Sequence, residues 1–264
     1  MGFWQWRSTP SRADSRGSAA FSGLCNAAPL RAQLRSRAVC RRSTGRDRGV
    51  PAMKTIALVT GGFLLAIVSL ALYASFDGGS FTVHMVLHMG IVAVAAPLIA
   101  YGLLDTRFDL SRRFVWMTPV LASVIELVVV WGWHVPVMRA LAATSILLSM
   151  LELLSFLVAG MLLWVVCLRP GRDGGGRLAG TIGLLLTSMH MTLLGVLLAL
   201  APRPLYGKGE VSCFGIPLDA ISDQQIGSVV MLVAGSASYL IGGVALLSDV
   251  LRAEGDVARE DRRW

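Results

Sequence analysis

The sequence predicts an all-α integral membrane protein, a helical bundle of about six transmembrane helices. Of its 264 residues 55% are hydrophobic and only 15% are charged, whereas soluble domains carry about a quarter charged residues. Stretches of about 20 apolar residues, each long enough to cross a bilayer, recur along the chain. This composition argues against a soluble hydrolase or a nucleic-acid-binding protein, so we expect no nucleic acid among the partners.

The N-terminal segment, residues 1–52, differs from the rest in composition. It holds ten of the 24 Lys and Arg residues and has no sustained apolar period. Such a segment cannot bury enough apolar surface to order itself. It is open to three interpretations, namely a disordered basic arm, an Arg- and Ser-rich transit peptide, or a mis-assigned start with translation beginning at Met53. We expect the bundle over 53–252 and a cytoplasmic tail over 253–264.

Apolar stretches bounded by charged residues or by Gly and Pro predict the individual spans. They cover residues 55–75, 81–104, 115–135, 143–168, 178–201 and 224–248. The first stretch could instead be a cleaved signal, but it has no clean small-x-small cleavage site, so we interpret it as a span.

The distribution of basic residues predicts the orientation of the bundle. Lys54, the even-numbered connections and the C-terminal segment together carry 11 Lys and Arg residues, and the odd-numbered connections carry three. The positive-inside rule therefore places both termini in the cytoplasm. Tryptophans agree with this topology, because Trp116 and Trp164 fall at predicted inner ends and Trp131 and Trp133 at a predicted outer end.

The four histidines of the chain fall in the outer half or the middle of the predicted membrane. At a helical rise of about 1.5 Å per residue, His84 lies about 5 Å and His88 about 10 Å below the outer end of the second span. His134 is expected at the outer surface and His190 near mid-membrane. Ionisable groups at such depth are costly and are functional by default, so we expect one site drawn from several helices.

The spacing of these residues suggests copper. His84 and His88 lie four residues apart on one helix face, and each is followed by a methionine. Imidazole and thioether together suit copper better than zinc. The predicted metal ligands are His84, His88, His134, His190, Met85, Met89, Met191 and Asp223, which opens the sixth span. In the simpler interpretation, the methionines are apolar filler and the histidines link helices by hydrogen bonds.

Two carboxylates lie inside apolar stretches and need partners. Glu126 and Glu152 each fall about 12 Å below the outer end of a predicted span at the same rise. A protonated carboxyl would meet that need, and so would a carboxylate that hydrogen-bonds a metal-ligating histidine from behind. We expect the second arrangement for both.

Motifs for other chemistries are lacking. Cys25, Cys40, Cys167 and Cys213 form no Cys-x-x-Cys pair, so the sequence indicates neither a disulfide framework nor a thiol redox centre. The glycine run 174–176 has no following Lys-Ser or Lys-Thr and is not a phosphate-binding loop. We therefore expect no enzymatic activity.

Short motifs from the second to the sixth span resemble one known family. They are His84-Met85-x-x-His88-Met89, Ala96-Pro97-Leu98 with Gly102, Trp133-His134-x-Pro136, Ser155-Phe156-Leu157 with Gly160 and Trp164, His190 with Gly195, and Asp223-Gln224-Gln225-x-Gly227. Together, over about 80–245, the chain resembles the polytopic CtaG-type cytochrome c oxidase assembly factors. Many members carry a further histidine near the glutamate of the fourth span, whereas here Glu152 is followed by Leu153.

The resemblance implies a multi-pass protein of the bacterial plasma membrane that helps to form an active haem-copper oxidase. Its implied partners are cytochrome c oxidase subunits, a copper donor protein and the lipid bilayer. We therefore expect an assembly factor that binds or relays copper at the outer membrane face. Two alternatives stay open, a haem b electron carrier with His88 and His190 as axial ligands, and a transporter of copper or another small cation.

Overall fold

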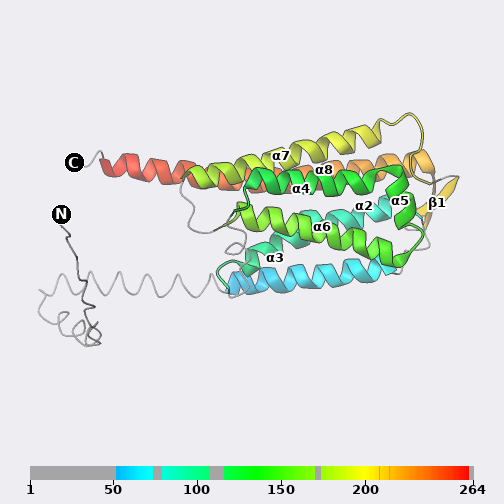
Figure 1. The fold of residues 1–264 in the computed structure, drawn as a ribbon, viewed down its shortest axis with the longest axis horizontal. Coiled ribbons are helices and arrows are strands. Elements are labelled where there is room, and N and C mark those ends of the chain that lie inside the picture. Colours follow the sequence, from blue (N-terminus) through cyan, green and yellow to red (C-terminus); the bar gives the residue numbers. More distant parts are fainter. Residues whose placement is uncertain are drawn as a thin grey trace, which may run out of the picture. The chain divides into compact units, whose positions relative to one another are not determined.

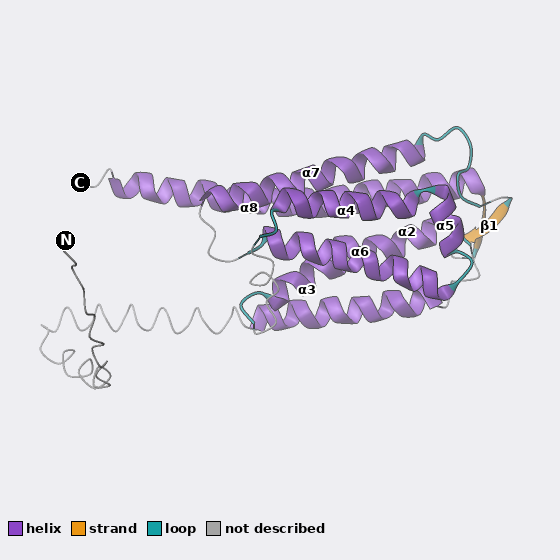
Figure 2. Ribbon diagram, in the orientation of Figure 1, coloured by secondary structure: helices purple, strands orange, loops and turns teal. Residues whose placement is uncertain are grey.

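The computed structural model describes residues 52–73, 79–106, 116–169, 174–207, 209–213 and 215–261. Over these residues the protein is mostly helical, as the sequence predicts, and the strands form a single two-stranded hairpin (Figure 2). Residues 1–51 lie outside the described residues, so the three interpretations of the N-terminal segment stay predictions.

Five of the described helices are long and apolar enough to cross a membrane. They are Ala52–Tyr73, Phe81–Leu103, Ile146–Cys167 (α6), Gly174–Ala199 (α7) and Ala220–Gly255, which is most of α8. A sixth candidate is a pair of helices with a bend between them, Pro119–His134 (α4) and Pro136–Ala142 (α5). Each candidate overlaps a predicted span, and the long helices run side by side along the long axis in Figure 1. The fold is that of a multi-pass membrane protein.

The helix Phe81–Leu103 contains a π-helical segment at its centre. It divides into α2 (Phe81–Met89), η3 (Gly90–Ala95) and α3 (Ala96–Leu103). Pro97 has no N–H to donate to the carbonyl of Ala93, four residues earlier. The Ser238 hydroxyl of α8 donates to that carbonyl instead, at 2.7 Å. The irregular segment is therefore fixed by a contact to another helix, and π segments of this kind are frequent near functional sites.

The third predicted span is broken, which the sequence analysis did not foresee. Proline fixes its own φ and disfavours a helical conformation in the residue before it. Val135 accordingly has φ −62° and ψ 128°, and the chain turns by 74° before α5 begins at Pro136. At a rise of about 1.5 Å per residue, α4 is only about 24 Å long. Its C-terminal residue, His134, therefore stands at the bend.

The strands β1 (Glu210–Cys213) and β2 (Ile216–Asp219) pair antiparallel and lead directly into α8 (Ala220–Asp261). Figure 1 shows α5 and β1 at the same end of the bundle, which we call the hairpin end. At this end Asp219 accepts hydrogen bonds from the backbone N–H groups of Ile221 and Ser222, both at 3.1 Å. This cap starts α8 four residues before the predicted boundary. The Ser222 hydroxyl also donates to Asp219 and holds the pKa of its carboxyl below the usual range.

The far end of α8 extends into the segment predicted as the tail, whose location in the cytoplasm stays a prediction. The helix runs on to Asp261, beyond residue 253, where the sequence analysis places the start of a tail. In Figure 1 this last part projects past the other helices at the end away from the hairpin.

Tryptophan positions match the interfacial prediction only in part. Trp116 is 69% exposed, as expected of an interfacial residue. Trp164 is buried and stacks on Tyr239 with ring centroids 5.8 Å apart, so its predicted interfacial place is wrong. A Cβ built on Gly242 would lie 2.5 Å from the Trp164 ring, so this glycine leaves the space that the indole fills between α6 and α8.

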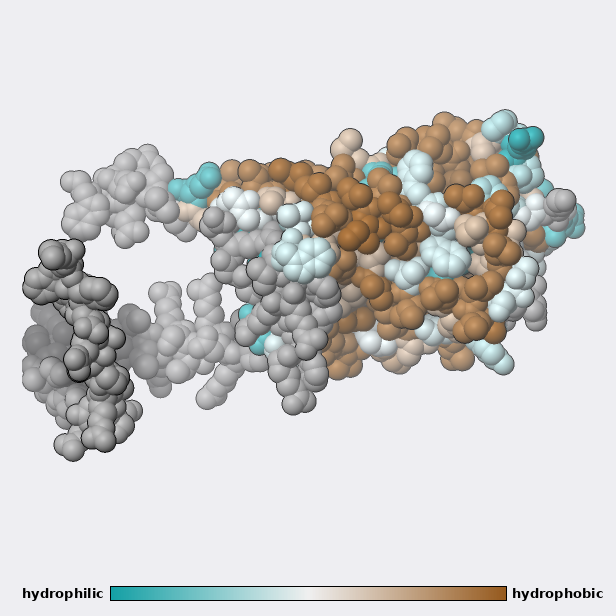
Figure 3. Space-filling view, viewed as in Figure 1, coloured by the Kyte–Doolittle hydropathy of each residue, from teal (hydrophilic) through white to brown (hydrophobic). Residues whose placement is uncertain are grey.

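The outside of the bundle is apolar. Large hydrophobic side chains are exposed on every long helix and show as brown surface in Figure 3. So much exposed apolar surface would promote aggregation in water and instead fits a surface that contacts lipid.

Candidate functional site

The N-terminus of α2 is held by Asp223 from the first turn of α8. Its carboxylate accepts hydrogen bonds from the Ser80 hydroxyl at 2.7 Å and from the backbone N–H groups of Phe81 and Thr82 at 2.6 and 3.2 Å. The Thr82 hydroxyl donates in return to the Asp223 carbonyl at 2.7 Å. A negative charge at a helix N-terminus satisfies its free N–H groups and the helix dipole. This contact fixes α2 against α8 one turn before His84.

His84 lies beside a buried ion pair. Its Nε2 is 3.2 Å from Oε1 of Glu152 on α6, and the other carboxylate oxygen is 3.6 Å from Nη1 of Arg139 on α5. These atoms lie at ion-pair distance, but none of them makes a hydrogen bond of good geometry. The structure thus places Glu152 next to a predicted ligand, and it adds an arginine that the sequence analysis treated only as a charge in a connection.

His88 lies in the middle of the buried ring cluster. Its ring centroid is 6.4 Å from that of His84 and 5.5 Å from that of His134. One face of the imidazole stacks on Phe156 of α6, with centroids 3.8 Å apart and planes 11° from parallel. Both ring nitrogens are buried and have no hydrogen-bond partner. We refer to His84, His88 and His134 as the histidine cluster.

His134 completes the cluster from the last residue of α4. It is only 5% exposed, so its side chain is buried inside the bundle, and its depth at the outer membrane surface stays a prediction. Its Nδ1 lies 2.6 Å from the carbonyl of Val130. Because a carbonyl only accepts, Nδ1 must carry the proton, and the lone pair of the neutral ring is then on Nε2. Nε2 is buried and has no partner.

His134 stands at the bend before α5 and is covered there by Tyr206. The connection between α7 and α8 passes near it, and the Tyr206 hydroxyl donates to the His134 carbonyl at 2.6 Å. Burial raises the pKa of Tyr206 to about 12, so this hydroxyl remains a donor at neutral pH. The ring of Tyr206 also stacks on Phe81, with centroids 4.4 Å apart.

His190 and the methionines lie elsewhere. His190 is buried on α7 and faces the backbone of Ser123 on α4. Among the described residues, no ring contact joins it to the histidine cluster. Met89 and Met191 meet at Gly235 of α8, where the Met89 Sδ would lie 3.4 Å from an added Cβ. Because Met89 points toward α8 and the His88 ring stacks on α6, Met89 and His88 occupy different faces of α2, and Met191 belongs to α7. Met85 is fully buried in the apolar core.

Glu126 has a partner that the sequence analysis did not identify. Its carboxyl accepts a hydrogen bond from the Tyr239 hydroxyl of α8, and it lies at the point where α4 passes Gly160 of α6. One turn earlier, the hydroxyls of Ser123 and Thr187 are 2.7 Å apart. Glu126 therefore belongs to the packing of α4 against its neighbouring helices, and among the described residues no hydrogen bond or ion pair joins it to a histidine.

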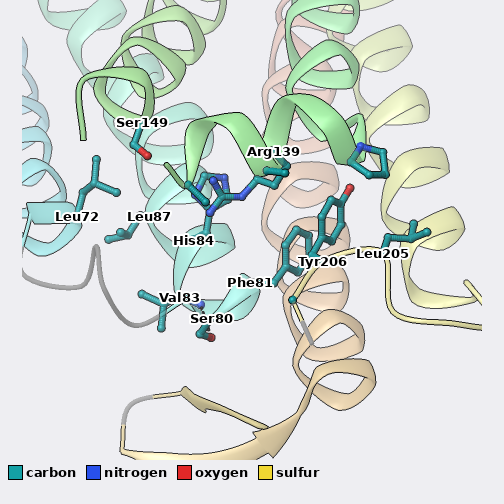
Figure 4. Close-up of a pocket in the computed structure, with 15 residues that line it drawn as sticks. Leu72, Ser80, Phe81, Val83, His84, Leu87, Arg139, Ser149, Leu205 and Tyr206 are labelled. Atoms are coloured by element: carbon teal, nitrogen blue, oxygen red, sulfur yellow. Dashed lines mark hydrogen bonds between the residues drawn. The ribbon is translucent and has the colours of Figure 1, made fainter. Parts of the chain in front are cut away.

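A pocket of about 290 Å³ reaches the histidine cluster from the hairpin end. His84 and Arg139 line it together with side chains of α2, α5, α6 and the connection after α7 (Figure 4). Arg139 extends toward His84 in this view, while Leu205 lies at the other side of the pocket. Leu205 and Gly207, which also lines the pocket, are exposed. The cluster is thus buried but lies next to a route from the surface.

The described residues do not contain a preformed metal site of three or more His, Cys, Asp or Glu ligands. What the structure brings together is a set of imidazoles with free nitrogens, one carboxylate and one guanidinium. Sequence reasoning missed Arg139, Phe156 and Tyr206 as members of this set. An arginine in the short apolar segment 136–142 was the one available signal, since a charge there needs a partner.

Fold and site together define a polytopic helical membrane protein with a buried histidine cluster near one end of the bundle. The family described as cytochrome c oxidase caa3 assembly factor matches residues 34–253. The chain therefore belongs to the cytochrome c oxidase caa3 assembly factor family, as the motifs indicated. No curated protein and no solved structure matches it.

Proposed function

We propose that this protein binds or relays copper at its histidine cluster during assembly of a haem-copper cytochrome c oxidase. It would do so in a bacterial plasma membrane, with the hairpin end outside, and without turnover chemistry of its own. Copper is then cargo that arrives from a donor protein and leaves for an oxidase subunit. Membership of the assembly factor family supports the oxidase as the partner.

The observation that carries the proposal is that the buried ring nitrogens of His88 have no hydrogen-bond partner. A buried polar group without a hydrogen bond is costly, and in native proteins such groups are rare enough to need an explanation. Neither nitrogen of His88 has a partner, and the same holds for both nitrogens of His190. Only His88 is also fully buried between two other histidines, with ring centroids 6.4 and 5.5 Å away. A metal ion bound by an imidazole nitrogen would supply the missing interaction.

The spacing of the rings supports a shared ion. With metal–nitrogen bonds of about 2.0 to 2.1 Å, two imidazoles on one ion have ring centroids ~5 to 6.5 Å apart. The separations of His88 from His134 and His84, 5.5 and 6.4 Å, lie in this range. Glu152 beside His84 would orient that ring, as carboxylates commonly do for metal-binding histidines.

Imidazole without nearby thiolate accepts either oxidation state of copper. The cluster would therefore bind copper from the donor protein and release it to an oxidase subunit. The proposal does not use His190, Asp223 or the three predicted methionines, because it rests on His84, His88 and His134 alone. The two alternatives from the sequence remain outcomes of the test.

The test compares His88→Ala with His190→Ala in cells that depend on the oxidase. Loss of His88 should lower oxidase activity about tenfold with the chain present at near-normal amounts, and excess copper should restore part of it by mass action. His190→Ala, which removes a buried histidine outside the cluster, should leave the activity near normal. Normal respiration with His88→Ala would contradict the proposal, as would a Soret band in the purified protein or copper uptake into vesicles.

A further inference from the structure

The pocket beside the histidine cluster offers an incoming ligand very few free polar groups. Its three hydroxyls, on Ser80, Ser149 and Tyr206, already donate to other parts of the protein. Its remaining lining is apolar side chains and glycines, apart from His84 and Arg139. A molecule in the pocket therefore meets one imidazole and one guanidinium.

The guanidinium of Arg139 has capacity to bind. Its Nη1 is buried and makes no hydrogen bond, and it stands 3.6 Å from Glu152 without closing onto the carboxylate. Arg139 lines the pocket, whereas Glu152 does not. A ligand that comes from the surface thus meets a positive charge before it can reach a negative one.

This order of charges disfavours a hydrated copper cation. Such an ion would lose its water in a largely apolar pocket and approach a like charge at short range, where the low dielectric strengthens repulsion. An anionic complex has the opposite balance, because its negative group can pair with the guanidinium while copper lies near the imidazoles. Arg139 would then select the form in which copper arrives.

We propose that the pocket accepts cuprous copper as an anionic thiolate complex, with Arg139 pairing with the thiolate-bearing donor. This inference rests on the proposed function of the cluster. Transfer is a ligand exchange without oxidation or reduction, in which copper–sulfur bonds break, copper–nitrogen bonds to the cluster form, and the thiolate leaves as an anion beside Arg139.

The test measures copper loading of the purified full chain in detergent, without oxygen, from two cuprous complexes of opposite charge. One is the anionic glutathione complex and the other is the cationic thiourea complex, and retained copper is followed over time by rapid gel filtration. Arg139→Gln should slow loading from the glutathione complex about tenfold, the lower end of charge-steering effects on association. The same change should leave loading from the thiourea complex unchanged or faster.

Two variants and one condition control the result. Arg139→Lys keeps the charge and should retain most of the loading rate, and Arg203→Gln removes an exposed arginine outside the pocket and should change neither rate. In the wild type, added salt should slow loading from the glutathione complex only, because screening weakens the attraction. The salt dependence is measured on the wild type, so it tests the inference even where Arg139→Gln fails to fold.

Equal slowing of both complexes by Arg139→Gln, or no slowing of either, would overturn the inference while leaving copper binding intact. So would wild-type loading from the glutathione complex that added salt does not slow. Failure of the wild type to retain copper from either complex would overturn the proposed function as well.

Discussion

The carboxylate of Asp223, in the first turn of α8, accepts a hydrogen bond from the backbone N–H of Phe81 at 2.6 Å. Phe81 is the first residue of α2, and His84 follows it within one turn. This side chain, which is a metal ligand in the prediction from the sequence, thus accepts three hydrogen bonds, two from helix N–H groups and one from the Ser80 hydroxyl. Its contribution to the histidine cluster is to fix the helix that carries two of the three rings.

Asp223→Asn should destabilise the protein and weaken copper binding without changing its stoichiometry. The amide keeps one acceptor but places an NH₂ group against a donor, so we expect a loss of about 1 to 2 kcal/mol in the free energy of unfolding. Thermal unfolding in detergent and copper titration measure the two effects. Asp219→Asn, which touches only the start of α8, is the matched control and should leave copper affinity unchanged. Loss of one copper equivalent with Asp223→Asn would restore the ligand interpretation.

Close contact between α2 and α8 depends on Gly227. A Cβ at this position would lie 2.7 Å from the Phe81 ring and 3.1 Å from the Thr82 Cα. Gly227→Ala should therefore force the helices apart and cost about 1 to 3 kcal/mol. Gly132 in α4 has nothing within 4 Å of an added Cβ, so Gly132→Ala should be neutral or stabilise the helix by up to about 1 kcal/mol. Equal unfolding temperatures for the two variants would contradict this packing.

The contact between Glu126 and Tyr239 is expected to serve stability and not copper. Tyr239→Phe leaves a fully buried carboxyl without its donor, which should cost about 1 to 3 kcal/mol. Glu126→Gln in the same chain should recover part of the loss, because an amide is cheaper to bury than a carboxyl without a partner. A double-mutant cycle on thermal unfolding measures the coupling. Copper stoichiometry should stay that of the wild type in Tyr239→Phe, in Glu126→Gln and in the double variant. Loss of bound copper in any of the three would tie Glu126 to the metal.

Orientation in the membrane remains a prediction from the positions of basic residues. A reporter active only outside the cytoplasm should work when inserted in the 202–207 connection and fail when fused after Asp261. Both positions flank α8, so the pair of fusions is its own control. The opposite pattern would place the hairpin end in the cytoplasm and remove the outer face from the proposed function.

Hydropathy was enough to predict the helical bundle and the positions of four of the six spans within a few residues, because lipid contact demands long apolar segments. It could not predict the bend at Val135, since a proline within an apolar run fits a straight, a kinked or a broken helix equally well. It also missed the burial of Trp164, because an indole in the last turn of a helix suits either the membrane interface or a space left by a glycine on another helix.

Part of the site was predictable from helical spacing and from depth in the membrane. The four-residue spacing placed His84 and His88 on one face, and depth alone brought Glu152 near them. Depth says nothing of which way a side chain points, so Met89 and His190 were grouped with rings that they do not touch. Arg139 was missed because the bend that turns α5 over the cluster is a tertiary feature, and only that bend brings the guanidinium to Glu152.

X-ray absorption at the copper edge, on the purified protein loaded with cuprous copper, tests the central claim most directly. We expect one copper per chain with two or three nitrogen neighbours at about 2.0 Å, the bond length of imidazole ligands. His88→Ala should lose the bound copper or the imidazole scattering, while His190→Ala should give the wild-type spectrum. A wild-type protein that retains no copper, or a first shell made of sulfur alone, would contradict a copper site at His84, His88 and His134.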